Sequence, residues 1–176
     1  MAATDTELVL RVCRDGDPNA FAELVNRYQS TVRSFIRKMT RGDAHLADDI
    51  AQDTFLRAWQ KIHTYRQEAR FLTWLLAIAY NQFRSRARRR EETCCQDIEE
   101  TVRRPENSPA NAAEDLRMDL EEAMKLLRDG ERAAIGLCCQ QGLTHEEAAR
   151  ILNCPLGTVK TNIMRGREKL RRRLRI

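Results

Sequence analysis

Apolar residues recur every three to four positions through most of the chain, which is the spacing of amphipathic α-helices. No segment alternates apolar and polar residues for long enough to predict a sheet. Asp17-Pro18 favours the start of a helix and Gly42 its end, while Thr144 and Glu147 form a capping box that starts another. The pattern therefore predicts an all-α fold class. The expected helices cover about 6–14, 17–41, 43–62, 70–90, 115–128, 131–141, 144–152 and 156 to the C-terminus.

Charge divides the chain into three parts. Residues 63–90 hold seven Arg and one Glu, residues 91–115 hold eight acids and two Arg, and residues 155–176 hold eight Lys or Arg and one Glu. The middle part includes RRPENSPANAAED, which has no apolar period and is typical of an extended linker. The expected organisation is two small helical domains, 1–90 and 116–176, joined by a flexible acidic linker.

The 176 residues carry a formal net charge of +5, and the isoelectric point is near 9.1. This excess of cations favours an anionic partner such as nucleic acid. No apolar run approaches the roughly 20 residues that span a bilayer, and no secretion signal is evident, so a cytoplasmic protein is expected. The six cysteines include two adjacent pairs and no CxxC, a poor arrangement for chelation. We expect no metal site and no cofactor, and a redox-sensing cysteine stays open.

The segment LADDIAQDTFLRAW is acidic and aromatic, although the chain is basic. On a helical wheel one side gathers the residues expected in the core: Ala47, Ala51, Phe55, Ala58, Trp59 and Ile62. A second side forms a stripe of Asp49, Gln52, Asp53 and Leu56. A leucine among carboxylates suits a basic, partly apolar protein partner. A solvated face with one stray leucine explains the same pattern equally well.

Residues 63–90 combine an aromatic loop with a cationic helix. The loop side chains that could hold an unstacked base are His63, Tyr65, Arg66 and Gln67, although loops of this composition also occur without such a role. The outward face of the helix is expected to carry Arg70, Thr73, Ala77, Tyr80, Asn81, Arg84 and Arg88. On that face Asn81 can read base edges, while Arg84 and Arg88 can neutralise phosphates. Trp74 is expected in the core rather than on a stacking surface.

The segment GLTHEEAARILNCPLGTVKTNIMRGREKLRRRL has the proportions of a helix–turn–helix that binds DNA. The first turns of a recognition helix contact bases, which assigns to the major groove Thr158, Lys160, Thr161, Met164 and Arg165. Later cations such as Arg172 are expected on phosphates. A cationic helix can also bind a membrane surface, but the turn and helix in front of it make that interpretation weaker.

Three blocks resemble one known family in order and spacing. DDIAQDTFLRAWQKI, FLTWLLAIAYNQF and LTHEEAARILNCPLGTVKTNIMRGREKLRR closely resemble blocks of the extracytoplasmic-function (ECF) bacterial sigma factors. The resemblance implies sigma region 2 in the first domain and sigma region 4 in the second. The chain departs from the family at Thr161-Asn162, where Ser-Arg is frequent, and at Ser85, where an acid is frequent. These departures leave the promoter sequence open.

The resemblance implies a promoter-specificity subunit that binds core RNA polymerase. The stripe Asp49, Gln52, Asp53 and Leu56 would dock on the β′ clamp helices, and region 4 would meet the β flap. The 63–70 loop and the Asn81 face would bind the non-template strand of the minus-ten element, and the last helix would read the minus-thirty-five element of promoter DNA. The acidic linker would lie in the basic RNA channel of polymerase. An anti-sigma factor, often membrane-bound in this family, would be a further partner.

Two other classes of function compete with this interpretation. A stand-alone helix–turn–helix regulator would explain the end of the chain, but it leaves the acidic stripe and the cationic helix at 70–90 without a purpose. An enzyme is not expected, because the sequence has no Gly-rich phosphate loop, no HExxH and no nucleophile–base pair.

Overall fold

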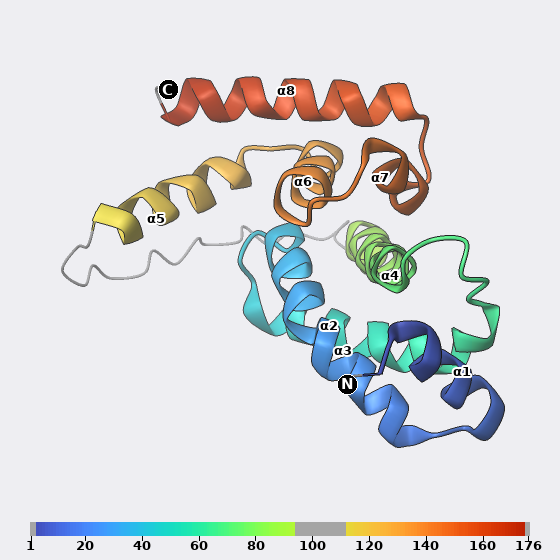
Figure 1. Ribbon diagram of the computed structural model, residues 1–176. Helices are drawn as coiled ribbons and strands as arrows, with labels where there is room; N and C mark the ends of the chain where they lie inside the picture. The colour runs from blue at the N-terminus through green and yellow to red at the C-terminus, as the bar shows by residue number, and fades with distance from the viewer. Residues whose placement is uncertain (1–2, 94–111, 175–176) are drawn as a thin grey trace.

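The computed structural model describes residues 3–93 and 112–174, and every regular element in these two ranges is helical (Figure 1). The first range holds α1 (Asp5–Asp15), α2 (Pro18–Met39), α3 (Ala44–Lys61), the short 3-10 helix η1 (Ile62–Thr64) and α4 (Phe71–Thr93). The second holds α5 (Ala112–Lys125), α6 (Asp129–Ile135), the π-helical segment η2 (Gly136–Gln140), α7 (His145–Leu152) and α8 (Leu156–Leu174). The predicted all-α fold class is confirmed.

The helix starts follow from local side-chain chemistry. The Asp17 carboxylate accepts hydrogen bonds from the backbone N–H groups of Asn19 and Ala20, and Pro18 occupies the first helical position of α2. At the start of α7 the Thr144 hydroxyl accepts from the Glu147 N–H, while the Glu147 carboxylate accepts from the Thr144 N–H. Each of these caps satisfies N–H groups that have no partner inside the helix.

Several element boundaries differ from the sequence prediction. The linker expected over 91–115 is helical at both ends, because α4 continues to Thr93 and α5 starts at Ala112; its remainder, 94–111, lies outside the described residues. The helix expected over 131–141 changes to π geometry after Ile135. Apolar periodicity shows that a helix is present, but it does not resolve a change of helix type within it.

The helices of the two regions stack in layers (Figure 1). The long helix α8 lies on the outer side, α6 and α7 lie beneath it, and α2 and α4 come next. Most buried apolar residues of both regions form one continuous cluster, which runs from Leu8 in α1 to Ile163 in α8, while Met124, Leu127 and Ile135 form a second, smaller cluster. Two domains that the sequence predicts as separate units therefore share a core in this structure.

Close packing of α6 against α8 positions the helix–turn–helix. Gly166 allows this approach, because a Cβ at that position would lie 2.5 Å from Cδ1 of Ile135. On α8 the residues that face inward and are buried are Val159, Ile163 and Gly166. The opposite face of α8 consequently points to solvent.

Arg132 is the largest fully buried side chain of the described residues, at 1 % exposure. Its guanidinium donates to carbonyl oxygens at the end of α5, namely those of Met124 (3.1 Å) and Leu127 (2.6 Å). It also donates to the Met39 carbonyl at the end of α2 and pairs with the Asp129 carboxylate. Burial lowers the pKa of Arg132 and Asp129 opposes this effect, so the charge is stabilised by helix C-termini and one acid.

Candidate protein-docking and nucleic-acid interfaces

The acidic stripe of α3 faces outward as its sequence predicts. Leu56 is 56 % exposed, and the Asp49 and Gln52 side chains are also exposed. Asp53 lies at the edge of the surface with a partly exposed carboxylate. All four stripe residues therefore share one accessible surface, on which a large apolar side chain is surrounded by polar groups.

The assignment of Trp59 to the core is wrong. Trp59 is 39 % exposed and Phe55 is half-buried, whereas Ile50 and Thr54 are fully buried in their place. The Thr54 hydroxyl is satisfied within the helix, because it donates to the Ile50 carbonyl at 2.7 Å. A threonine whose hydroxyl donates to a carbonyl of its own helix can be buried at little cost in free energy. The buried face of α3 therefore includes Ile50 and Thr54 and does not include Trp59.

Trp59 instead helps to line a groove between α2 and α3. The groove has a volume of about 650 Å³, and its aromatic and apolar lining includes Phe21, Val25, Phe55, Leu56 and Trp59. The rings of Phe21 and Trp59 meet edge to face, with centroids 5.0 Å apart. Asp49 and Gln52 of the stripe lie on the same groove. The sequence analysis assigned only Leu56 of this apolar set to an outward surface. The available signal was the presence of three large apolar residues, Phe55, Leu56 and Trp59, within five positions of one helix.

Arginines from neighbouring helices partly neutralise the stripe. Arg86 of α4 lies 2.5 Å from the Asp53 carboxylate and 3.6 Å from that of Asp49. Arg33 of α2 pairs with Asp48 at 3.1 Å. Three aspartates and two arginines leave a local charge of about −1. These ion pairs are solvent-exposed and worth about 0–1 kcal/mol each, so a cationic partner can displace them.

The loop after α3 is organised by Tyr65. Its ring packs against those of Phe71 and Trp74, with centroids 5.5 Å from each, and its hydroxyl donates to the Ala69 carbonyl at 2.7 Å. Burial raises the pKa of Tyr65. Its ring is thus already engaged in the aromatic cluster that holds the loop. Trp74 is part of the same cluster, as the sequence predicts.

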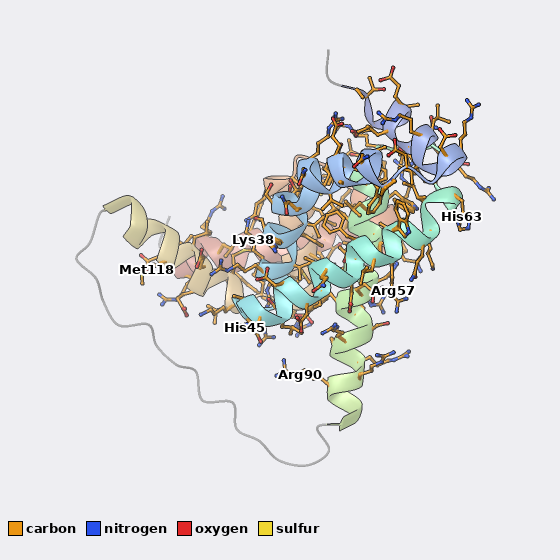
Figure 2. The ribbon with its side chains drawn as sticks, turned by 90° about the horizontal axis from the view of Figure 1, so that it is seen from below. Lys38, His45, Arg57, His63, Arg90 and Met118 are labelled. Atoms are coloured by element: carbon orange, nitrogen blue, oxygen red, sulfur yellow. The ribbon has the colours of Figure 1, made fainter. Side chains whose placement is uncertain are left out.

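The other loop residues predicted to hold a base remain accessible. His63 lies at the end of the α3–η1 segment with its side chain at the surface (Figure 2), and Arg66 is exposed beside it. Gln67 has a φ of 58°, a left-handed conformation that turns the chain sharply after Arg66. The structure thus leaves His63 and Arg66 open to a ligand and ties Tyr65 into the scaffold.

The outward face predicted for α4 is open in only one half. Asn81, Arg84 and Arg88 are exposed, and Figure 2 shows this end of α4, near Arg90, extending beyond the other helices. Thr73 and Tyr80, which the wheel places on the same face, are only 3 % and 8 % exposed. The expectation of an open face is therefore wrong for the first half of the helix. The helix α7 packs against it there, and the Thr73 hydroxyl lies 3.2 Å from the Glu147 carboxylate.

The first turns of α8 present the residues that the sequence assigned to DNA bases. Thr158, Lys160, Met164 and Arg165 are exposed, and Met164 reaches 65 %. Thr161 is partly exposed, and its hydroxyl donates to the Gly157 carbonyl at 2.9 Å. An apolar side chain this exposed, among cations on an outer helix, is suited to contact with the methyl group of thymine.

Two cationic residues in the C-terminal turns of α8 form ion pairs with acidic residues of the second helical region. Lys169 pairs with the buried Glu131 at 2.7 Å, and Arg172 pairs with Glu168 of its own helix at 2.8 Å. Burial alone would raise the pKa of Glu131, but Lys169 and the Arg128 N–H outweigh it and lower that pKa. Lys169 thus serves the packing of α6 on α8, whereas Arg172 stays largely exposed and can exchange Glu168 for a phosphate.

The described cysteines are free thiols. The Arg167 guanidinium lies 3.4 Å from the Cys139 sulfur, while burial raises the pKa of the Cys138 thiol. Within 3–93 and 112–174, no three His, Cys, Asp or Glu side chains cluster so as to hold a metal ion. In the same ranges no helix has the length and apolar character needed to cross a membrane.

Family models match both helical regions of the chain. Residues 24–93 match sigma-70 region 2, and residues 117–170 match sigma-70 region 4. The chain is 34 % identical to an ECF RNA polymerase sigma-E factor of Haemophilus influenzae, over 97 % of this chain and 95 % of that protein. Identity is also 34 % with the sigma-E factor of Escherichia coli K12, over 95 % of this chain and 92 % of that one.

Two solved structures of similar fold are complexes with a second protein. One contains the sigma factor RpoE bound to the anti-sigma factor NepR of Bartonella quintana, with a TM-score of 0.73 and 26 % identity over 89 % of this chain and 97 % of that one. Another contains CnrH bound to the cytosolic domain of CnrY, with a TM-score of 0.72 and 26 % identity over 97 % and 96 %. The helical fold, both regional matches and the identity to sigma-E factors agree, and the chain belongs to the ECF group of sigma-70 factors, the promoter-specificity subunits of bacterial RNA polymerase.

Proposed function

We propose that the stripe and groove of α3 form the docking site for the β′ clamp helices of core RNA polymerase. The observation that carries this proposal is the exposure of Leu56 and Trp59 on one helix, beside the carboxylates of Asp49 and Asp53. A soluble domain seldom leaves two large apolar side chains together at a groove unless a partner covers them. Exposed carboxylates at the rim would steer a basic partner, while the apolar centre supplies the affinity.

Promoter DNA would be bound by two other surfaces. The open half of α4, with Asn81, Arg84 and Arg88, would bind the non-template strand of the minus-ten element, and His63 and Arg66 would help to hold an unstacked base. Tyr65 would act by shaping this loop, because its ring and hydroxyl are engaged within the region.

The first turns of α8 would enter the major groove of the minus-thirty-five element. Thr158, Lys160, Thr161, Met164 and Arg165 would face base edges, and Arg172 would bind a phosphate. Region 4 would also meet the β flap of polymerase. The chain would perform no chemistry of its own, since strand separation would be driven by the free energy of binding unstacked bases.

An anti-sigma factor is the partner proposed for the free protein. The complex of the similar sigma factor RpoE with the anti-sigma factor NepR supports it, and the exposed groove of α3 offers such a partner the surface that polymerase would use. The protein would act in the cytoplasm, with its inhibitor held at the membrane in the manner frequent among ECF factors. The role of the linker in the RNA channel remains a prediction, because residues 94–111 lie outside the described ranges.

Reconstitution with core polymerase tests the proposal. The full-length chain is mixed with core enzyme from its own host and with a library of genomic fragments, and the transcripts are sequenced. We expect start sites that share two sequence elements at a fixed separation and that disappear when the chain is omitted. Absence of any chain-dependent transcript would refute the promoter-specificity role.

A further inference from the structure

Four of the seven glycines are explained by the fold itself. Gly16, Gly42 and Gly142 have φ values of 62°, 95° and 65°, in the left-handed region that side chains disfavour. Gly166 packs against Ile135, where a Cβ would lie 2.5 Å from Cδ1 of that residue. At these positions a larger residue would strain either the backbone or the packing of the helices.

Gly157 has neither reason to be glycine. It is the exposed second residue of α8, and its φ lies outside the left-handed region. A Cβ built on it would meet no described atom within 4 Å, its chain neighbours and the backbone of its own helix aside. The remaining two glycines, Gly130 and Gly136, instead face the side chains of Asn162 and Phe35. Glycine weakens a helix relative to alanine, because it loses more conformational freedom on folding, so the free chain does not explain Gly157.

The exposed backbone at Gly157 lies on the outward side of α8. Thr161 and Met164 follow it by four and seven residues, so the three positions share one side of the helix. Met164 is 65 % exposed, and the Thr161 hydroxyl donates back to the Gly157 carbonyl at 2.9 Å. Since α8 forms the outer layer of the molecule (Figure 1), a partner can reach the main chain of this helix at Gly157, whereas side chains cover it further along.

The first turn of α8 also offers a hydrogen-bond donor. N–H groups at the start of a helix have no acceptor inside that helix. In α8 the N–H groups of Thr158 and Val159 both donate to the Pro155 carbonyl, at 2.9 and 3.3 Å. The Gly157 N–H precedes both of them and can donate to an acceptor outside the protein. The helix dipole and the exposed Lys160, three residues further on, favour a negatively charged acceptor at this end.

We propose that Gly157 admits the DNA backbone: a phosphate of the minus-thirty-five element approaches the main chain at Gly157 and accepts a hydrogen bond from its N–H. This inference rests on the proposed function in placing α8 at that element. Phosphate contacts fix the position of a protein on the duplex, and base contacts then specify the sequence. Gly157 is therefore a positioning residue, because a side chain there would hold the phosphate away from the helix.

Gly157→Leu tests the proposal, with Gly157→Ala as the smaller step. Both new residues form helices more readily than glycine, and both side chains would extend into open space, so the chain should still fold. Asn19→Leu is the matched control, because Asn19 is the exposed second residue of α2 in the other region. Fluorescence anisotropy of the full-length chain measures the affinity for two labelled duplexes, one with the minus-thirty-five element found by reconstitution and one with a scrambled sequence. Urea unfolding measures stability.

We expect Gly157→Leu to bind both duplexes at least about tenfold more weakly, as the loss of a hydrogen bond to a charged group implies, and Gly157→Ala to lie between it and the wild type. The urea midpoint should stay level or rise, so that affinity falls without any loss of stability. For Gly157→Ala the slope of log K against log salt should not change, because a neutral N–H releases no counterion. Asn19→Leu should bind both duplexes as the wild type does.

Unchanged affinity of Gly157→Leu would overturn the inference. A loss confined to the cognate duplex would also overturn it, because a base rather than a phosphate would then lie at Gly157. Lower urea midpoints for both Gly157 variants would make the glycine structural, and an equal loss for Asn19→Leu would make the effect unspecific. If the wild type itself binds the cognate and scrambled duplexes equally, the proposed role of α8 fails and the inference fails with it. If the wild type discriminates between them, the other outcomes refute the Gly157 contact alone.

Discussion

The outer faces of α3 and α8 differ in how many helices build them. The α3 surface carries Phe55, Leu56 and Trp59 beside carboxylates of its own helix, and residues of α2 such as Phe21 and Val25 complete the groove that is proposed as a docking site. The α8 face carries its cations, threonines and Met164 on one helix that points to solvent. A protein partner is recognised through buried apolar area, which takes several elements to build, whereas a DNA groove accepts one helix.

The double substitution Asp49→Arg with Leu56→Ala should have the largest effect. It places a cation and removes the apolar anchor on the stripe, so the affinity for core polymerase should fall at least about 100-fold. Both side chains are exposed, so the thermal unfolding midpoint should hardly change. Asp15→Arg makes the same change of charge at the end of α1 and should bind normally. Retained affinity of the double variant in a pull-down would remove the docking role of α3.

Trp59→Ala should come next, with a loss of affinity for core polymerase of about 10- to 100-fold. Its loss of stability should be smaller, about 1 kcal/mol, because the ring is 39 % exposed and its edge-to-face contact with Phe21 is modest. Calorimetric titration with core enzyme and urea unfolding separate the two quantities. A loss of stability alone would make Trp59 a packing residue and would restrict the docking site to Leu56.

Arg165→Ala should cost about 1–3 kcal/mol on the cognate minus-thirty-five element if its guanidinium binds a guanine by two hydrogen bonds. Arg172→Ala is the comparison, because a phosphate contact should weaken cognate and scrambled duplexes alike and reduce the slope of log K against log salt by about 1. Both quantities follow from anisotropy titrations at several salt concentrations. Equal losses on both duplexes for Arg165→Ala would make it a phosphate contact instead.

Arg86→Gln should have a smaller and opposite effect at the docking surface. Loss of this cation removes the ion pairs with Asp49 and Asp53, so the stripe becomes more negative and should associate with polymerase about two to five times faster at low salt. The gain should vanish in high salt because the charges are screened. Stopped-flow association measured at both salt concentrations tests this, and a slower rate would mean that Arg86 itself contacts the partner.

Tyr28→Phe should leave both functional faces unchanged and alter only the pH dependence of stability. Burial and the hydrogen bond to Asp5 raise the pKa of Tyr28 to about 12, above its ordinary value of 10.0. Between these values the unfolded chain loses the phenolic proton and the folded chain keeps it, so the stabilisation is complete below pH 10 and is lost towards pH 12. Urea unfolding at pH 9, 10.5 and 12 should show a steeper fall for wild type than for Tyr28→Phe. Parallel curves would show that this phenol titrates normally.

The order of the helices and the identity of the two regions could be predicted from the sequence. The caps at Asp17 and Thr144 are local chemistry, and apolar spacing identifies each helix. The outward positions of Leu56 and Met164 also follow from a wheel, because neither lies on the apolar row of its own helix. The sequence alone therefore determined the all-α fold class, the sigma family and one accessible face on each of α3 and α8.

Tertiary structure decided which outward-facing residues are actually accessible. A wheel gives directions about one helix axis, but it does not show which neighbouring helix covers a given direction. For this reason Thr73 is buried against α7, Tyr80 is buried although the wheel places it outward, Trp59 opens onto a groove built with α2, and Arg86 reaches the stripe from another helix. Arg132 is the clearest case, since its partners at Met39 and Met124 meet only when the ends of α2 and α5 converge on one buried charge.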